Sequence, residues 1–141
     1  MRVLVTGSRQ IIDQRRVYPR LDAIYDSWLH PAVFTESELK HVMSQKRTFV
    51  VVHGSAAGAD TLANTWVWDR RGEARPPMVE PHPANWARYG RLAGPIRNQE
   101  MVDLGADLVL AFFQPGAENR GTQNCVNAAR LKGLTVEEFW D

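Results

Sequence analysis

Short apolar runs recur along the chain and predict its strands. Four runs are nearly continuous, and a fifth, partly polar run closes the chain; they cover 3–5, 49–52, 77–79, 108–113 and 135–139. Runs without polar alternation are typical of strands covered on both faces, as in a parallel sheet. From the second run on, the starts lie about 30 residues apart, which is the length of a strand–helix–strand unit. The pattern therefore predicts five strands in a mostly parallel sheet.

Between the runs, apolar residues recur at helical spacing. Val17, Leu21 and Trp28 share one face of a helix predicted over 16–29. Pro19 is expected in the first turn of that helix, where its missing N–H costs nothing. Further helices are predicted over 60–71, from Pro95 to Gly105, and over 122–132.

The segment over 31–47 is an insert that lengthens the first connection between strands. Thr35 and Glu38 form a capping-box pattern, and Leu39 and Met43 follow at helical spacing. We therefore predict a helix in this insert. The sequence leaves open whether the insert covers a site or forms an interface.

Strands that alternate with helices define an open, doubly wound α/β sheet with helices on both faces, a Rossmann-like architecture. The 141 residues, with 44% apolar and 23% charged side chains, suit one globular domain over 1–141 and exclude a disordered chain. In such sheets, ligands bind beyond the carboxyl ends of the strands. The loops that follow the strands are therefore the places to look for a site.

Charge and cysteine content limit the partners and the cellular compartment that we expect for the protein. The net charge of +1 demands neither nucleic acid nor an anionic membrane. Cys125 is the single cysteine, so no intrachain disulfide can form, and we expect a cytoplasmic protein. No apolar run reaches about 18 residues, and we expect neither a transmembrane helix nor a signal peptide.

The loop after the first strand reads T-G-S-R over 6–9. Gly7 lets the backbone approach a ligand, Ser8 offers a hydroxyl, and Arg9 can pair with a phosphate. The alternative is an ordinary turn with a solvated arginine, because glycine is the default turn residue.

The loop after the second strand, 53–60, is rich in small residues and leads directly into a helix. Helix N-termini attract anions through free N–H groups and the helix dipole, which makes Gly54, Ser55 and Gly58 candidate phosphate contacts. Neither a P-loop nor the dinucleotide fingerprint is present. Asp60 either contacts ligand hydroxyls or caps the helix.

The segment over 83–101 follows the third strand. Arg97 and Asn98 fall in the predicted first turn of a helix, where an arginine opposes the dipole unless an anion or acid compensates it. We interpret this misfit as a sign of ligand binding; the alternative is a salt bridge to Glu100 or Asp103. Trp86 lies in the same segment and can stack on a base.

The loop after the fourth strand reads Q-P-G-A-E-N-R-G-T. Gly116 and Gly121 bracket a turn, and Thr122 is expected to cap the next helix. Backbone N–H groups, the Thr122 hydroxyl and Arg120 can together cradle a phosphate. A plain Gly/Pro loop with a threonine cap is the alternative.

Other chemistry has little support in the sequence. The four histidines and Cys125 lack metal-ligand spacing, and no nucleophile elbow or Ser-His-Asp set is recognisable. We expect no metal and no required cofactor.

Three of these loops together resemble the YspA-type branch of the SLOG superfamily, which groups the Smf/DprA proteins with the cytokinin-activating LOG enzymes. The motifs are T-G-S-R, H-G-x-x-x-G-A-D and P-A-x-W-x-x-x-G-x-x-A-G-P-x-R-N-x-x-M. The resemblance spans nearly the whole chain apart from the insert. It implies a Rossmann-like fold that binds nucleotides or nucleotide-derived ligands, and ADP-ribose-like and NAD-derived ligands have been proposed for the superfamily.

The resemblance also suggests a homodimer and a bacterial or phage source. It carries ligand contacts over to Gly7, Ser8, Arg9, Gly54, Gly58, Asp60, Arg97, Asn98, Gly121 and Thr122.

The fourth loop departs from the LOG hydrolases. Those carry P-G-G-x-G-T with an acidic residue two or three positions later, whereas this chain has a loop two residues longer, followed by Asn124 and Cys125. Cleavage of a glycosidic bond usually relies on a carboxylate. Glu100, Glu118 and Asp60 are the remaining candidates, and the sequence singles out none of them.

Three functions remain open at this point. The first is binding of a nucleotide or nucleotide-derived ligand, by a sensor or sequestering module without chemistry of its own. The second is a LOG-like phosphoribohydrolase that cleaves the N-glycosidic bond of a nucleoside monophosphate. The third is DprA-like binding of single-stranded nucleic acid, which the near-neutral net charge disfavours. Its basic and aromatic edge would comprise Arg88, Arg91, Arg97, Arg120, Trp86 and Tyr89.

Overall fold

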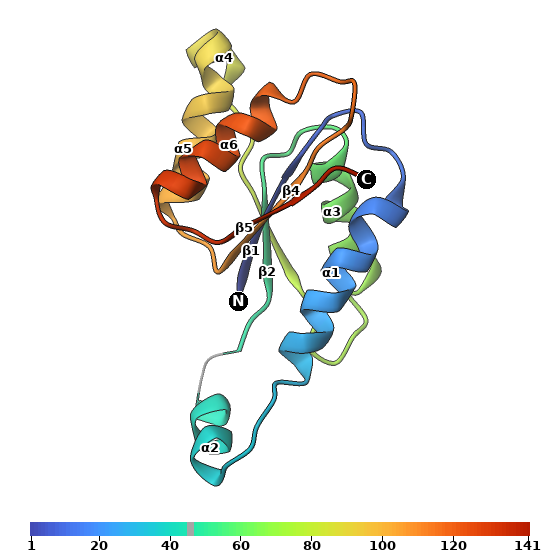
Figure 1. Cartoon of the computed structure of the whole chain (residues 1–141), viewed down its shortest axis with the longest axis vertical. Coiled ribbons are helices and arrows are strands. Elements are labelled where there is room, and N and C mark those ends of the chain that lie inside the picture. The colour runs from blue at the N-terminus through green and yellow to red at the C-terminus, as the bar shows by residue number, and fades with distance from the viewer. Residues whose placement is uncertain (45–46) are drawn as a thin grey trace.

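The computed structural model describes residues 1–44 and 47–141. At its centre is a five-stranded sheet in the order β3-β2-β1-β4-β5, in which every neighbouring pair is parallel. This confirms the predicted α/β sheet (Figure 1). The strands are β1 (Arg2–Gly7), β2 (Val50–His53), β3 (Met78–Pro81), β4 (Leu108–Phe112) and β5 (Val136–Phe139).

Helices cover both faces of the sheet, as Figure 1 shows. Consecutive residues of a strand point to opposite faces, and β1 feeds two apolar layers in this way. Val3 and Val5 pack with Leu21 and Trp66, whereas Leu4 packs with Met101 on the other face. The first layer belongs to α1 (Gln14–Leu29) and α3 (Ala59–Asp69), the second to α5 (Ala93–Asp103) and α6 (Arg120–Leu131).

Helix α1 begins earlier than predicted. Asp13 caps it, because its side chain accepts a hydrogen bond from the backbone N–H of Arg15 at 2.9 Å. Pro19 therefore lies in the second turn, and its placement in the first turn was wrong. The carbonyl of Arg15 loses the intrahelical donor that another residue at position 19 would supply.

Helix α5 also begins earlier than predicted, at Ala93 and not at Pro95. The short helix α4 (Trp86–Tyr89) and a single 3-10 turn, η1 (Gly90–Leu92), lead directly into it. As a result, Arg97 lies in the second turn of α5 and not in the first turn, as predicted. The helix dipole acts more weakly there than in the first turn.

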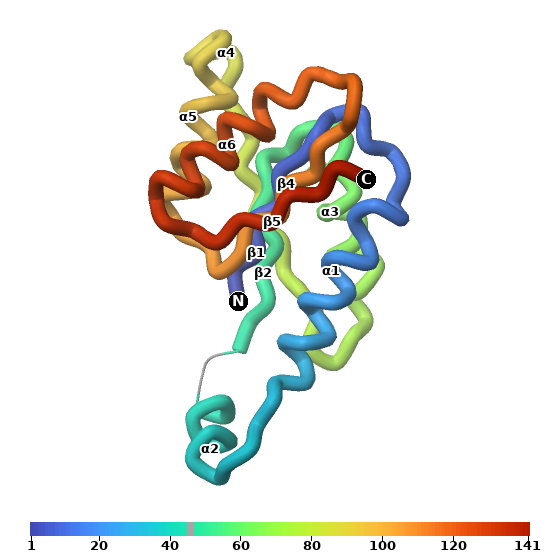
Figure 2. Tube along the Cα trace, in the orientation of Figure 1, coloured from blue at the N-terminus to red at the C-terminus, as the bar shows by residue number. Residues whose placement is uncertain are grey.

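The insert forms helix α2 (Glu36–Ser44), as predicted, although positions 45–46 of the insert lie outside the described residues. The capping box is present: Thr35 accepts from the backbone of Glu38 at 3.1 Å, and Glu38 accepts from that of Thr35 at 3.0 Å. No residue of α2 is buried, and both views show it apart from the sheet (Figures 1 and 2).

Candidate functional site

A cavity of about 660 Å³ opens beyond the carboxyl ends of β1 and β4. The chain leaves β1 toward β2 on one side and β4 toward β5 on the other, so this is the topological switch point of the sheet. Ligands of open α/β sheets bind at this point. The predicted site residues that line the cavity are Gly7, Ser8, Arg9, Asp60, Trp86, Arg97, Asn98, Glu118, Arg120, Gly121 and Thr122.

A second cavity of about 340 Å³ adjoins the first beyond β2 and β3. Gly54 and Ser55, both predicted site residues, line it together with Ala57, Pro83 and Ala84. The two cavities share the residues of their common wall, which are Arg9, Ala56, Trp86 and Arg97.

Three of the predicted ligand-contact and catalytic residues line neither cavity, and Arg88 and Tyr89 of the predicted nucleic-acid edge also lie outside both. Gly58 has φ +80°, and a Cβ at this position would overlap the Ser8 carbonyl, so this glycine allows two loops to pack. Gly116 also has a positive φ and lies in a turn with open space around it. Glu100 is exposed on α5, outside both walls.

The loop after β1 is held against its neighbours. A Cβ on Gly7 would lie 2.5 Å from the Cβ of Ala59 and 2.9 Å from the carbonyl oxygen of Phe112, so only glycine fits. The backbone N–H of Ser8 donates to the same Phe112 carbonyl at 2.9 Å. Arg9 follows with an exposed side chain, and its Cζ lies 5.8 Å from the centre of the Trp86 ring.

Asp60 organises the loop after β2. Its Oδ2 accepts hydrogen bonds from the backbone N–H groups of Gly54 at 3.0 Å and Ala56 at 3.2 Å. It does not cap its own helix, whose N-cap position is Gly58. Burial raises the pKa of Asp60, while the two hydrogen bonds and the nearby Arg97 oppose the rise.

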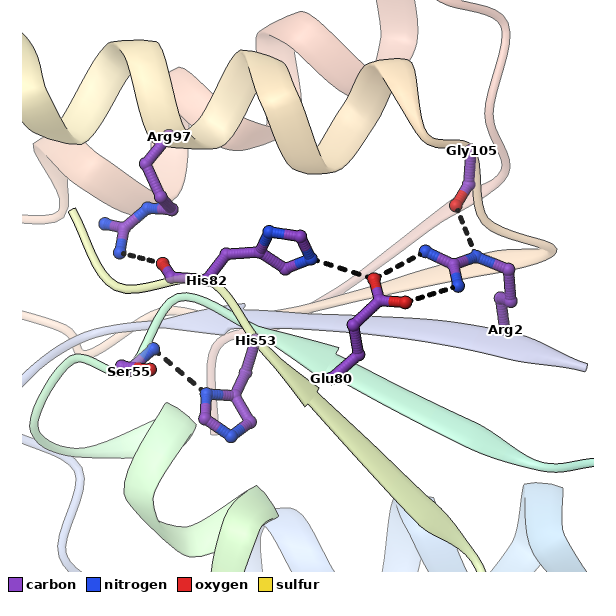
Figure 3. Close-up of polar contacts among 7 residues, drawn as sticks. All are labelled: Arg2, His53, Ser55, Glu80, His82, Arg97 and Gly105. Atoms are coloured by element: carbon purple, nitrogen blue, oxygen red, sulfur yellow. Dashed lines mark hydrogen bonds and ion pairs between the residues drawn. The ribbon is translucent and has the colours of Figure 1, made fainter. Parts of the chain in front are cut away.

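His53, the last residue of β2, holds the same loop through a hydrogen bond to its backbone. Its Nδ1 accepts a hydrogen bond from the backbone N–H of Ser55 at 2.9 Å, and its Nε2 lies 2.9 Å from Oδ1 of Asn64 (Figure 3 shows the Ser55 contact). This pattern requires a neutral ring with the proton on Nε2. Ser55 is held at φ +59°, a left-handed conformation that is rare for residues other than glycine.

Arg97 joins two loops to helix α5 at the common wall. Its Nη1 donates to the backbone carbonyls of Gly54 and, at 3.3 Å, His82, and its Nε donates to Oδ1 of Asn98 at 2.9 Å. Figure 3 shows the contact with His82. The acid that faces it is Asp60. Burial nevertheless lowers the pKa of Arg97, and the positive charge of Arg9 adds to that effect.

A network of charged and polar side chains lies behind Arg97, and no sequence pattern indicated it. Arg2 binds Glu80 through two hydrogen bonds of 2.8 and 2.9 Å, and Glu80 lies 2.8 Å from Nε2 of His82 (Figure 3). These contacts lower the pKa of Glu80 to about 2, chiefly through the hydrogen bonds from Arg2. The network holds β3 and the carbonyl of His82 in place for Arg97.

Asn98 connects α5 to the start of α6. The side chain is 4% exposed, and its Nδ2 donates to Oδ1 of Asn124 at 2.9 Å and to the carbonyl of Gly121 at 3.2 Å. Asn124 lines the cavity. From the sequence, this position was of interest only because the acidic residue of the LOG hydrolases is missing there. The expectation that Thr122 caps α6 was wrong, since Asn119 is the N-cap and Thr122 lies within the first turn.

Asn119 also braces the loop after β4. Its Oδ1 accepts from the backbone of Gln114 at 3.0 Å, and its Nδ2 donates to the carbonyls of Gln114 and Ala117 at 3.1 Å. The loop thus presents the N–H groups at the start of α6 to the cavity. These first-turn groups have no acceptor within the helix.

Positive charge exceeds negative charge around the larger cavity. Four arginines line it against two carboxylates, Asp60 and Glu118, and Glu118 is itself paired with Arg120 at 3.3 Å. Among residues 1–44 and 47–141, no three His, Cys, Asp or Glu side chains gather as a metal site would require. Every helix in that described part is too short or too polar to cross a bilayer.

The fold and cavity define an α/β protein with a basic pocket at the switch point of a five-stranded parallel sheet. The chain is 39% identical to the "Gene 61 protein" of Mycobacterium phage D29 over 140 residues, which is 99% of this chain and 97% of that one. It therefore belongs to the family of that phage protein. No protein-family model and no solved structure matches it.

Proposed function

We propose that the chain binds a phosphorylated nucleoside, or a ligand derived from one, in the cavity at the carboxyl ends of β1 and β4. The observation that carries this proposal is the convergence of four arginines, a tryptophan and a helix N-terminus on one concave space of about 660 Å³. Cavities of roughly 300–1,000 Å³ are the usual size for small-molecule sites. The motif resemblance to the SLOG superfamily points to the same class of ligand.

The phosphate end of the ligand is best supported at the start of α6. The free N–H groups of the first turn and the hydroxyl of Thr122 offer donors, and Arg120 adds a charge at the rim. Helix N-termini bind phosphates through such donors and the helix dipole.

The base is best supported at Trp86. Its indole is half exposed, lines both cavities and has the guanidinium of Arg9 on one side. A flat aromatic ligand gains about 1–3 kcal/mol from stacking on such a surface. The fluorescence of Trp86 also provides a way to detect ligand binding.

The carboxylates at the cavity favour binding without cleavage. Asp60 is occupied by two backbone N–H groups, and the Glu118 side chain is largely exposed and paired with Arg120. The position two residues after Thr122 holds Asn124, an amide engaged by Asn98. We therefore propose a sensor or sequestering module as the primary function.

A thermal-shift panel tests this proposal. It contains AMP, ADP, NAD, ADP-ribose, cyclic AMP and ribose 5-phosphate, each with wild type, Arg97→Ala and Arg88→Ala. A ligand at about a hundred times its Kd adds about 2.7 kcal/mol to the free energy of unfolding, a shift of several degrees for a domain of this size. The expected result is a shift in wild type and Arg88→Ala that is lost in Arg97→Ala. No shift with any compound would contradict the proposal.

One observation favours hydrolysis as a second candidate function. Asp60 is a buried carboxyl at the cavity wall whose pKa is raised, a combination that often marks a general acid. Incubation with nucleoside monophosphates, followed by chromatography for free base, tests this function. Release of base by wild type but not by Asp60→Asn would establish it, and no release by wild type would remove it.

A further inference from the structure

The insert helix α2 presents an apolar face that the core of the domain does not cover. Leu39, Val42 and Met43 recur along it at helical spacing. Phe34 precedes the helix, and its side chain is 87% exposed, while that of Met43 is 75% exposed. None of the apolar clusters in the described part of the chain includes a residue of α2, and Figure 1 shows the helix apart from the sheet.

Local interactions do not account for a helix of this length. Helix α2 has nine residues, and isolated helices shorter than about 12–15 residues are marginal in water, because most helical stability comes from packing of an apolar face. The capping box satisfies the first turn, and Phe34 and Leu39 occupy the two positions that pack on each other in a hydrophobic staple. Phe34 nevertheless stays exposed. The missing packing must therefore come from a surface outside this chain.

The charges beside the apolar face are complementary to themselves. Glu36 and Lys40 lie one turn apart on the same flank of α2, with Nζ of Lys40 3.3 Å from Oε1 of Glu36, and both side chains are exposed. Two copies of α2 that run antiparallel about a twofold axis bring Glu36 of each copy toward Lys40 of the other. A parallel pair would place like charges opposite each other. The face therefore fits a second copy of itself in one orientation.

We propose that α2 is a self-association helix, which pairs antiparallel with α2 of a second copy of this chain and buries Leu39, Val42 and Met43 of both. The resemblance to the SLOG superfamily suggests a homodimer but does not extend to the insert, so it assigns no role to this surface. Two helices of nine residues bury less than the roughly 800 Å² per partner of a standard interface, and we expect a dimer of micromolar affinity. No residue of α2 lines either cavity, so the association is independent of the proposed nucleotide binding.

Sedimentation velocity over micromolar to submillimolar concentrations tests the inference on wild type, Met43→Glu and Ser37→Glu. Wild type should pass from monomer to dimer as the concentration rises. Met43→Glu should dimerise at least ten times more weakly, because it places a carboxylate between the two helices, and the exposed Met43 side chain contributes nothing to the core. Ser37→Glu adds the same charge on the opposite side of α2 and should dimerise as wild type does.

An exchange of charges tests the orientation of the two helices. Glu36→Lys and Lys40→Glu should each weaken dimerisation several-fold, because each replaces an attraction between copies with a repulsion. An equal mixture of the two variants should recover an affinity close to that of wild type, since each charge then faces an opposite charge on the other copy. A mixture that associates no better than either variant alone would overturn the antiparallel pairing.

Two results would overturn the self-association itself. A wild type that stays monomeric at every concentration would do so in favour of a different protein as the partner of α2. Dimers that Met43→Glu leaves unchanged would do so as well, because they form through another surface of the molecule.

Discussion

Gly54 leaves open the space that the guanidinium of Arg97 fills. A Cβ on Gly54 would lie 2.6 Å from Cζ of Arg97 and 2.9 Å from its Nε, and Arg97 donates to the carbonyl of the same glycine. A glycine in the loop after β2 and an arginine in α5 thus depend on each other. The arrangement fixes the wall between the two cavities.

Gly54→Ala should displace Arg97 and disrupt that wall. The added methyl group overlaps a guanidinium that is held by several hydrogen bonds, so the arginine must shift from its partners. We expect nucleotide affinity to fall at least tenfold, with the far-UV circular dichroism spectrum unchanged. Gly72→Ala is the matched control, because nothing lies within 4 Å of its Cβ position. Equal nucleotide affinity in both variants would contradict the account.

Asn98→Ala should lower stability by about 1–3 kcal/mol, because it leaves the carbonyl of Gly121 and the side chain of Asn124 without a buried donor. Urea unfolding measures the difference. Gln99→Ala is the control on the same helix, where an exposed hydrogen bond to Asp103 is lost and the expected change is within about 0.5 kcal/mol. Similar losses in the two variants would show that Asn98 does not join α5 to α6 as described.

Glu80 should contribute stability that depends on pH. Its folded pKa of about 2 lies below its ordinary value of 4.5, so the ion pair with Arg2 stabilises the fold fully above about pH 4.5. The contribution is lost as pH falls from 4.5 toward 2. Unfolding of wild type and Glu80→Gln across pH 6 to 2.5 should show a difference that shrinks with acid. A difference that stays constant would argue against the network in Figure 3.

Trp86 should report ligand binding by fluorescence. A base stacked on its half-exposed indole is expected to quench part of the emission, whereas Trp66 is buried in the core and should not respond. Trp86→Phe should abolish the quenching and weaken binding several-fold, since a smaller ring stacks less well. Trp140→Phe is the control, because Trp140 directly follows β5, the edge strand on the other side of the sheet from β3. Undiminished quenching in Trp86→Phe would place the base elsewhere.

Much of the fold could be predicted because local pattern and fold agree. The apolar runs of β1, β2 and β4 belong to strands covered on both faces, whereas the run at the edge strand β3 is partly exposed. The Thr35–Glu38 capping box forms as its spacing indicates. Helix starts were harder to predict. Helices α1 and α6 begin earlier than predicted because their N-cap residues are Asp13 and Asn119, which lie outside the apolar pattern.

The candidate site could be predicted as a set of loops but not as a set of contacts. Parallel strands bring their carboxyl ends to one edge, which is why Arg9 and Arg120 line one cavity from distant parts of the chain. The roles of Asp60 and Gly58 depend on packing between loops far apart in sequence, which local patterns do not encode. A buried acid that binds backbone N–H groups and an acid that binds a ligand look alike in a sequence.

The most direct test of nucleotide binding is calorimetric titration of ADP into wild type, Arg9→Ala and Arg88→Ala. Over residues 1–44 and 47–141, the Arg9 side chain makes no hydrogen bond or ion pair, so its loss removes a charge from the cavity and spares the fold. Arg88 is an exposed arginine of α4 outside both cavities. The account predicts binding by wild type and Arg88→Ala, and at least tenfold weaker binding by Arg9→Ala. Equal affinity in all three proteins, or no heat of binding in wild type, would contradict it.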